Sequence, residues 1–168
     1  MKQVILLCIF YFIAMSLYAQ TSNRRGIDVI TGKKILDSLP ATIQENTLNK
    51  QNDKVFEASG FIGVVVHRDY GGNNKLLLDV INNSPSINNI NTMLLSQPSN
   101  STNYKVTQVN GYKALIQQLN SEISKIGYEL LIPVNNTLIT FKAFGYTQDQ
   151  FLTMANSIPI AMVARKTK

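Results

Sequence analysis

Three short turns rich in Asn and Gly constrain the fold of this chain more than any other feature. They lie at Gly71 to Asn74, Asn110-Gly111 and Asn135-Asn136, and each separates two runs of β-branched or aliphatic residues. Gly and Asn accept the positive φ that tight hairpin turns require, so each turn predicts an antiparallel hairpin. The strands so predicted are 55–56, 61–70, 75–81, 104–109, 112–119, 125–134 and 137–144.

Helical patterns come before, between and after these strands. Thr31 is placed to cap a helix that Pro40 ends, and apolar residues at helical spacing between positions 87 and 94 predict a second helix. Thr147 and Gln150 form a capping-box pattern, so we expect a third helix up to Ile158. The run 160–163 is interpreted as a last edge strand. No βαβ alternation occurs, and the fold class predicted is α+β: an antiparallel sheet of six to seven strands covered by helices, as an α/β/α sandwich.

The order of these elements also resembles a known family. The stretch Val106 to Phe144, with Val109-Asn110-Gly111 leading a strand meander, and the following helix Thr147 to Ile158 resemble the Mog1/PsbP-like α/β/α domains. The resemblance is topological and covers about half of residues 20–168. Members of that group look like non-enzymatic adaptors and accessory proteins, so the resemblance implies a binding function and no catalytic residue.

The start of the chain has the pattern of a cleaved signal peptide. A basic residue at Lys2 is followed by an apolar run from Val4 to Ala14 and by small residues before Gln20. The run is shorter than the roughly 20 residues of a membrane-spanning helix. We therefore expect residues 1–19 to be removed on export to the periplasm or beyond the cell, and residues 20–168 to form one domain without a stable membrane anchor.

The only cysteine, Cys8, lies within this apolar run. Bulky leucines precede it where a lipid-attachment site needs small residues, so we interpret it as an ordinary member of the signal core. The exported domain would then have no thiol, which excludes disulfides, zinc–thiolate sites and a cysteine nucleophile.

The net charge of +6 is not spread along the chain. Seven cationic residues of the exported chain lie near its ends, whereas positions 35–164 hold eight Lys and Arg against nine Asp and Glu. Nucleic-acid binding needs a concentrated basic stripe with aromatic platforms. The neutral body and the export pattern therefore argue against a nucleic-acid partner.

His67 is the only histidine, and the residues after it, through Tyr70, are ionisable. On a strand His67 and Asp69 point to the same side, so a carboxylate-oriented general base is one interpretation. The other is a strand that becomes polar as it emerges into water near a turn. The sequence supplies no nucleophile, so His67 and Asp69 are weak catalytic candidates.

No metal site or cofactor is expected. Asp69 and Asp79 are the carboxylates that we expect to face each other across the first hairpin, and they lack the further ligands that calcium needs. Gly71-Gly72 lacks the lysine and the following helix of a phosphate-binding loop. Three glycosylation sequons, at Asn82, Asn100 and Asn135, follow from the abundance of asparagine.

The segment Asn82 to Asn103 is the candidate contact region. It is polar, yet it carries Ile87, Ile90, Met93 and Leu94. Either these side chains dock on the sheet as a short helix, or some remain exposed and bind a partner, with the flank Gln97 to Asn103 beside them.

Three classes of function remain open at this point. The first is an exported, non-catalytic module that binds a protein or an envelope component. The second is a carrier of a lipid or other apolar ligand, suggested by the runs Val64 to Val66 and Leu76 to Leu78, which are apolar on both faces. The third is a hydrolase that uses His67 and Asp69.

Overall fold

The computed structural model describes residues 26–71, 76–96, 103–120 and 126–168. Seven strands form one antiparallel sheet in the order β3-β4-β5-β9-β8-β7-β6, and a two-stranded hairpin, β1-β2, lies beside it. The strands are β1 (Thr42–Ile43), β2 (Asn46–Thr47), β3 (Lys54–Glu57), β4 (Val64–Tyr70), β5 (Leu76–Asn82), β6 (Tyr104–Val109), β7 (Tyr112–Asn120), β8 (Ile126–Val134) and β9 (Thr137–Phe144). The α+β class, the antiparallel sheet and its helical cover are as the sequence predicts.

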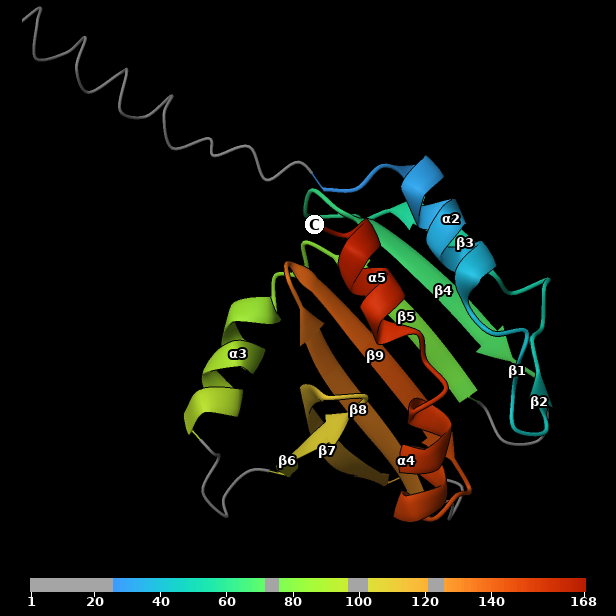
Figure 1. Ribbon diagram of the computed structural model, residues 1–168, viewed down its shortest axis with the longest axis vertical. Coiled ribbons are helices and arrows are strands. Elements are labelled where there is room, and N and C mark those ends of the chain that lie inside the picture. The colour runs from blue at the N-terminus through green and yellow to red at the C-terminus, as the bar shows by residue number, and fades with distance from the viewer. Residues whose placement is uncertain (1–25, 72–75, 97–102, 121–125) are drawn as a thin grey trace, which may run out of the picture.

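Four helices pack on the two faces of this sheet (Figure 1). They are α2 (Val29–Ser38), α3 (Ile87–Ser96), α4 (Gln148–Ala155) and α5 (Ile160–Lys166). Helices α2, α4 and α5 cover one face, which we call the helix face, and α3 packs on part of the opposite face, which we call the open face. Within the described residues, no helix combines the length and the apolar character that a bilayer span requires.

The tight turns behave as the sequence predicts. Asn110 and Asn135 have φ values of 51° and 53°, and Gly111 has a φ of 82°. The two-residue turns place Val109 opposite Tyr112 and Val134 opposite Thr137. The expected turn at 71–74 falls mostly outside the described residues, but β4 and β5 pair as an antiparallel hairpin.

Each face of the sheet carries its own core. The main core lies between the helix face and the three helices, where Phe141 and Phe151 stack with ring centroids 5.2 Å apart. Gly32 allows α2 to approach closely, because a Cβ there would meet Val55 and Val64 at 2.7 and 2.8 Å. The smaller core lies under α3 on the open face and is formed by Ile87, Ile90, Leu94, Leu115 and Leu138.

Three helix or strand assignments differ from the sequence prediction. Helix α2 begins at Val29, because Asp28 rather than Thr31 is its cap and accepts a hydrogen bond from the Thr31 N–H at 2.6 Å. The run from Ile160 is helix α5 and not an edge strand; Ile160 and Val163, one turn apart, are both buried. A run this short does not distinguish a strand from a helix by its pattern alone. The third helix, α4, ends at Ala155, while its capping box is present as predicted.

Candidate functional site

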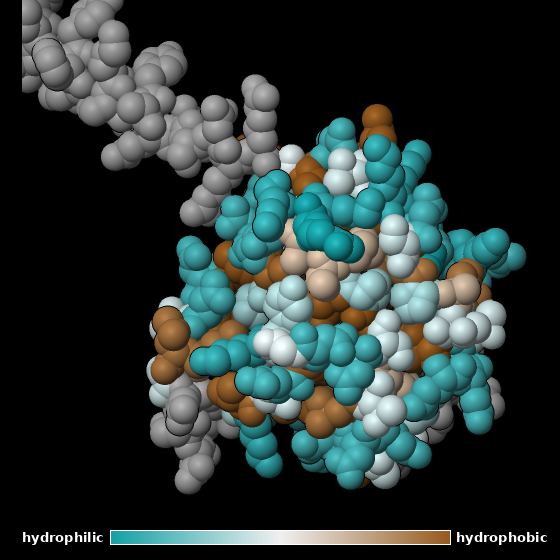
Figure 2. Space-filling model, in the orientation of Figure 1, coloured by the Kyte–Doolittle hydropathy of each residue, from teal (hydrophilic) through white to brown (hydrophobic). Residues whose placement is uncertain are grey.

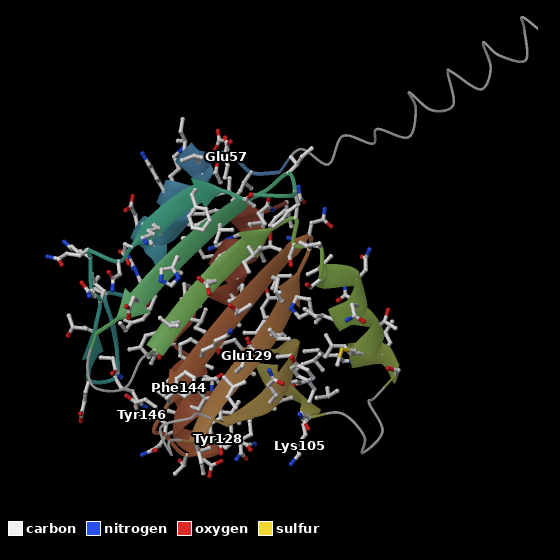
Figure 3. All side chains as sticks on the ribbon, turned by 180° about the vertical axis from the view of Figure 1, so that it is seen from behind. Glu57, Lys105, Tyr128, Glu129, Phe144 and Tyr146 are labelled. Carbon is white, nitrogen blue, oxygen red and sulfur yellow. The ribbon has the colours of Figure 1, made fainter. Side chains whose placement is uncertain are left out.

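The part of the open face that α3 leaves uncovered is the candidate functional site (Figure 3). Side chains on β4 and β5 alternate strictly between buried and half-buried, since successive residues of a strand point to opposite faces. Val65, His67, Leu77 and Asp79 belong to the half-buried set that points to the open face. Phe56, on the edge strand β3, lies opposite Val65 and remains 45% exposed.

One polar row crosses strands β4, β5 and β9. His67 lies opposite Asp79, with its ring Nδ1 2.6 Å from the Asp79 Oδ1. The Thr140 hydroxyl donates to the other oxygen of Asp79 at 3.3 Å. The side chains of His67 and Asp79 are each 26% exposed, so this pair is in contact with solvent.

The second polar row crosses the four strands β6, β7, β8 and β9, one step further along the sheet. Glu129 lies near its centre and is labelled in Figure 3; its carboxylate accepts from the Gln117 Nε2 at 2.5 Å and from the Lys142 Nζ at 2.9 Å. Only 11% of the Glu129 side chain is exposed, which makes these partners necessary, because burying an unpaired charge is costly. Burial and, second, the nearby Glu129 charge raise the pKa of Tyr104, at the end of this row.

Apolar side chains surround the two rows. Leu77 lies directly opposite Lys142, and Phe144 lies over Gly127, where a Cβ would come within 2.4 Å of the Phe144 ring. Gly127 therefore leaves the space that this ring occupies. The site combines half-buried apolar surface with charges that are already paired within the protein.

The catalytic candidates are only partly brought together. His67 and Asp69 point to the same face, but the carboxylate that contacts His67 is Asp79 on the neighbouring strand, and Asp69 accepts a hydrogen bond from Asn52 at 2.8 Å. The expected facing of Asp69 and Asp79 is also corrected, because Asp69 lies opposite Leu77. No hydroxyl contacts the His67 ring among the described residues; Thr140 contacts Asp79 instead.

The candidate contact residues of α3 mostly face the sheet. Ile87, Ile90 and Leu94 are buried in the smaller core and Met93 is half-buried against it, so the structure shows the docked alternative. Leu95 is 82% exposed on the outer side of α3. Most of the flank Gln97 to Asn103 lies outside the described residues.

Two ionisable side chains on the helix face, Arg68 and Tyr70, have a structural role. Arg68 is buried and pairs with Asp53 at 2.8 Å, and it also donates to the Leu39 carbonyl. Tyr70 donates to the Pro40 carbonyl at 2.9 Å, and burial raises the pKa of its hydroxyl to about 12. Both contacts hold the segment 39–53 against the sheet.

Neither the pairing of Asp79 with His67 nor the Glu129 row was predicted from the sequence. The register of β8 and β9 follows from the two-residue turn at Asn135-Asn136, which places Glu129 opposite Lys142. This pair could therefore be derived from the turn and the strand lengths. Among the described residues, no three His, Cys, Asp or Glu side chains gather in one place.

Comparison of the chain with protein-family models, with curated proteins and with solved structures found no match.

Proposed function

We propose that this chain is an exported, non-catalytic binding protein and that the uncovered part of the open face contacts a protein partner. The observation that carries the proposal is the unequal cover of one sheet. Three helices cover the main core on the helix face, whereas Val65, Leu77 and Phe144 stay half-buried, and Phe56 exposed, where α3 leaves the open face uncovered. Apolar side chains gathered on an uncovered sheet face are typical of contact sites.

The paired charges support this assignment. His67 with Asp79, and Glu129 with Lys142, are satisfied within the protein before any partner arrives. A partner that covers them removes water from pairs rather than from single charges, which lowers the cost of binding. Two sequence features also support this role. The resemblance to the Mog1/PsbP-like domains implies an accessory protein, and the signal-peptide pattern at residues 1–19 indicates export.

Pull-down from envelope extracts tests the proposal. The bait is the full chain, and the test variant is Leu77→Lys, which adds a charge beside Lys142 on the open face. The matched control is Gln148→Lys, which adds the same charge at an exposed position on α4. We expect Leu77→Lys to reduce capture of the partner at least tenfold, because it desolvates an unpaired cation in the interface, and Gln148→Lys to leave capture unchanged. Equal capture by the two variants would contradict the proposal.

The carrier function has less support. Val64, Val66, Leu76 and Leu78, from the two runs that suggested it, are at most 2% exposed and pack in the main core. Because Val66, Leu76 and Leu78 are enclosed by protein neighbours, these three supply no wall for an apolar ligand. Native mass spectrometry of the purified chain tests the alternative, which predicts a co-purified ligand.

A hydrolase remains a second candidate because of one contact. The 2.6 Å pairing with Asp79 directs the His67 Nδ1 into the sheet and leaves the other ring nitrogen as the one that could take a proton from water. Hydrolysis by this pair predicts turnover on a broad substrate panel that is lost in both His67→Ala and Asp79→Asn. Asp69→Asn, whose side chain contacts Asn52 instead, should keep that turnover.

A further inference from the structure

The described cationic residues of the two terminal segments lie on or beside two helices that contact each other. In the sequence they lie more than a hundred residues apart, on either side of a neutral body. In the structure α2 and α5 contact each other on the helix face, and the start of α2 lies at the same end of the sheet as the end of α5 (Figure 1). Lys33 and Lys34 lie in the middle of α2, and Arg165, Lys166 and Lys168 lie at or just after the end of α5; we call the surface that these five cations share the basic end.

Asparagine side chains fix the two segments at this end. Asn82, at the end of β5, accepts a hydrogen bond from the Ile27 N–H at 2.8 Å. Asn135, in the β8–β9 turn, donates to the Ala164 carbonyl at 2.8 Å. Asn82 also donates to Thr137, the residue that begins β9, at 3.0 Å. The basic end is therefore held by the sheet and does not depend on the contact between the helices alone.

The charge of the basic end is unbalanced. Across the described ranges, none of its five cations forms an ion pair. The acidic side chains nearby are Asp28, which caps α2, Asp37, which belongs to α2, and Glu57, so the five cations exceed the carboxylates by two. The Thr31 hydrogen bond holds the pKa of Asp28 below its usual value. Hydrophilic side chains gather over this end of the helix face in Figure 2.

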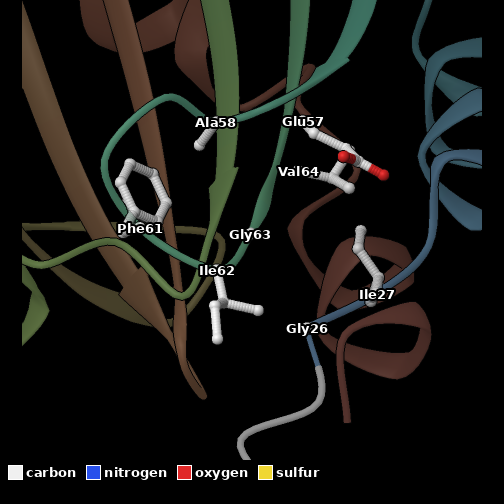
Figure 4. A pocket seen from close by; sticks show the side chains of 8 residues that line it. All are labelled: Gly26, Ile27, Glu57, Ala58, Phe61, Ile62, Gly63 and Val64. Atoms are coloured by element: carbon white, nitrogen blue, oxygen red, sulfur yellow. The ribbon is translucent and has the colours of Figure 1, made fainter.

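Apolar groups lie beside these cations. Ile62, in the β3–β4 loop, is 78% exposed, and Ile30, in the first turn of α2, is 64% exposed. A pocket of about 310 Å³ opens beside Ile62 (Figure 4), and Ile27, Phe61 and Val64 contribute to its apolar lining. The Ile62 carbonyl accepts from Asn83 at 3.0 Å, which places this loop at the same end of the sheet.

We propose that the basic end binds the surface of an anionic lipid bilayer. Peripheral membrane binding combines cations that attract anionic headgroups with apolar side chains that enter the headgroup boundary, and the basic end offers both. A soluble polyanion would use the cations but not the exposed isoleucines, so the observations favour a bilayer. This surface is separate from the open face and goes beyond the function proposed above.

Vesicle co-sedimentation tests this inference. The probes are vesicles of phosphatidylcholine alone and of phosphatidylcholine with 30% phosphatidylglycerol. The test variant removes four cations of the basic end as Lys33→Ser, Lys34→Ser, Arg165→Gln and Lys166→Gln. The matched control removes four exposed cations elsewhere as Lys50→Ser, Lys54→Ser, Lys105→Ser and Lys113→Ser. Every protein keeps residues 1–25, so differences report only on the substituted positions.

We expect the wild-type chain to prefer the anionic vesicles and to lose that preference at high salt. The test variant should lower the partition coefficient at least tenfold and the matched control less than threefold. Ile62→Ser should weaken binding by a factor that salt does not change, and Glu57→Gln should strengthen binding, because it removes an acidic group beside the pocket.

Equal losses in the test variant and the matched control would overturn the inference, as would equal binding to the two kinds of vesicle. A DNA duplex that competes with the vesicles while Ile62→Ser has no effect would reassign the basic end to a soluble polyanion. The double variants Lys33→Ser/Lys34→Ser on α2 and Arg165→Gln/Lys166→Gln on α5 are measured separately. Their melting temperatures distinguish a loss of binding from a loss of folding. None of these outcomes depends on the partner of the open face.

Discussion

On strand β4, Val64 and Val66 lie under α2 with at most 2% of their surface exposed, whereas Val65 and His67, which point to the opposite face, remain half-buried. The same alternation holds on β5. One sheet thus has a face whose core is buried under three helices and a face where α3 covers only one part. We expect the first face to supply most of the stability, and we propose the second as the contact surface.

The two faces also differ in the burial and the partners of their ion pairs. On the helix face the buried Arg68 and Asp53 hold a loop in place, and Arg68 also donates to two backbone carbonyls. On the open face Lys142 pairs with the more buried Glu129 and is itself 38% exposed. An ion pair inside the structure stabilises a particular arrangement of the chain, whereas a pair at the surface remains available to a partner.

The largest expected effect compares two phenylalanines of β9. Phe141 is fully buried on the helix face and stacks on Phe151, while Phe144 is half-buried on the open face. Phe141→Ala should lower the free energy of unfolding by about 3–5 kcal/mol, and Phe144→Ala by about 1 kcal/mol, since only the first leaves a closed cavity. Urea unfolding measures both. Similar losses would mean that the two faces are not distinct in stability.

The two ion pairs give the next comparison. Arg68→Ala should cost about 3 kcal/mol of unfolding free energy, because it leaves Asp53 and two backbone carbonyls without their partner. Lys142→Ala should cost less, about 1–2 kcal/mol, because the Lys142 side chain is 38% exposed and Glu129 keeps its bond to Gln117. Thermal or urea unfolding measures the difference, and a larger loss from Lys142→Ala would reverse the roles assigned to the two pairs.

A smaller effect concerns how the helix layer is held. The Asn110 amide donates to the carbonyls of Asn156 and Ile158, both at 3.0 Å, which ties the β6–β7 turn to the segment between α4 and α5. Asn110→Gly keeps the positive φ and should cost about 1–2 kcal/mol. Asn110→Asp should cost more, because a carboxylate would face two carbonyl oxygens. Hydrogen exchange in α5 should rise in both variants; an unchanged rate would contradict the role of this contact.

The last effect is absent at neutral pH and appears only when the pH rises above about 10. The native pKa of Tyr70 is raised to about 12 from 10.0, so the native state retains this proton when the unfolded chain loses it. Stability should therefore fall as the pH rises from about 10 to about 12, and Tyr70→Phe should flatten that part of the profile. Urea unfolding at each pH measures the slope. Tyr104→Phe, on the open face, is the control and should change the slope less.

The sequence predicted the fold where local chemistry decides the geometry. Asn-Gly at 110–111 and Asn135-Asn136 fix both the turn and the register, and the capping box at Thr147 fixes the start of α4. The prediction of a strand from Ile160 was wrong, because a short apolar run fits a helix and a strand equally well. The sequence pattern also could not give the partner of His67, because a one-residue change in the β4–β5 loop exchanges the faces of every side chain.

The open face was the least predictable feature. The sequence does not distinguish half-buried residues such as Leu77 from core residues, because both are apolar. The placement of α3 decides which of them are covered. The docking of α3 through Ile87, Ile90 and Leu94 was one of two alternatives that its amphipathic pattern allowed. The sequence shows that cationic residues concentrate near both ends of the chain. It does not show that the two groups lie close together, because that depends on the packing of α2 against α5.

Site-specific photo-crosslinking tests most directly the claim that the open face contacts a partner and the helix face does not. A photoreactive residue is placed at Phe56 on the open face and, in a second protein, at the exposed Asp149 on α4, which packs on the helix face. Both proteins are irradiated in envelope extracts and their adducts identified by mass. The account predicts one reproducible protein adduct from position 56 and none from position 149; the same adduct from both positions, or from 149 alone, would contradict it.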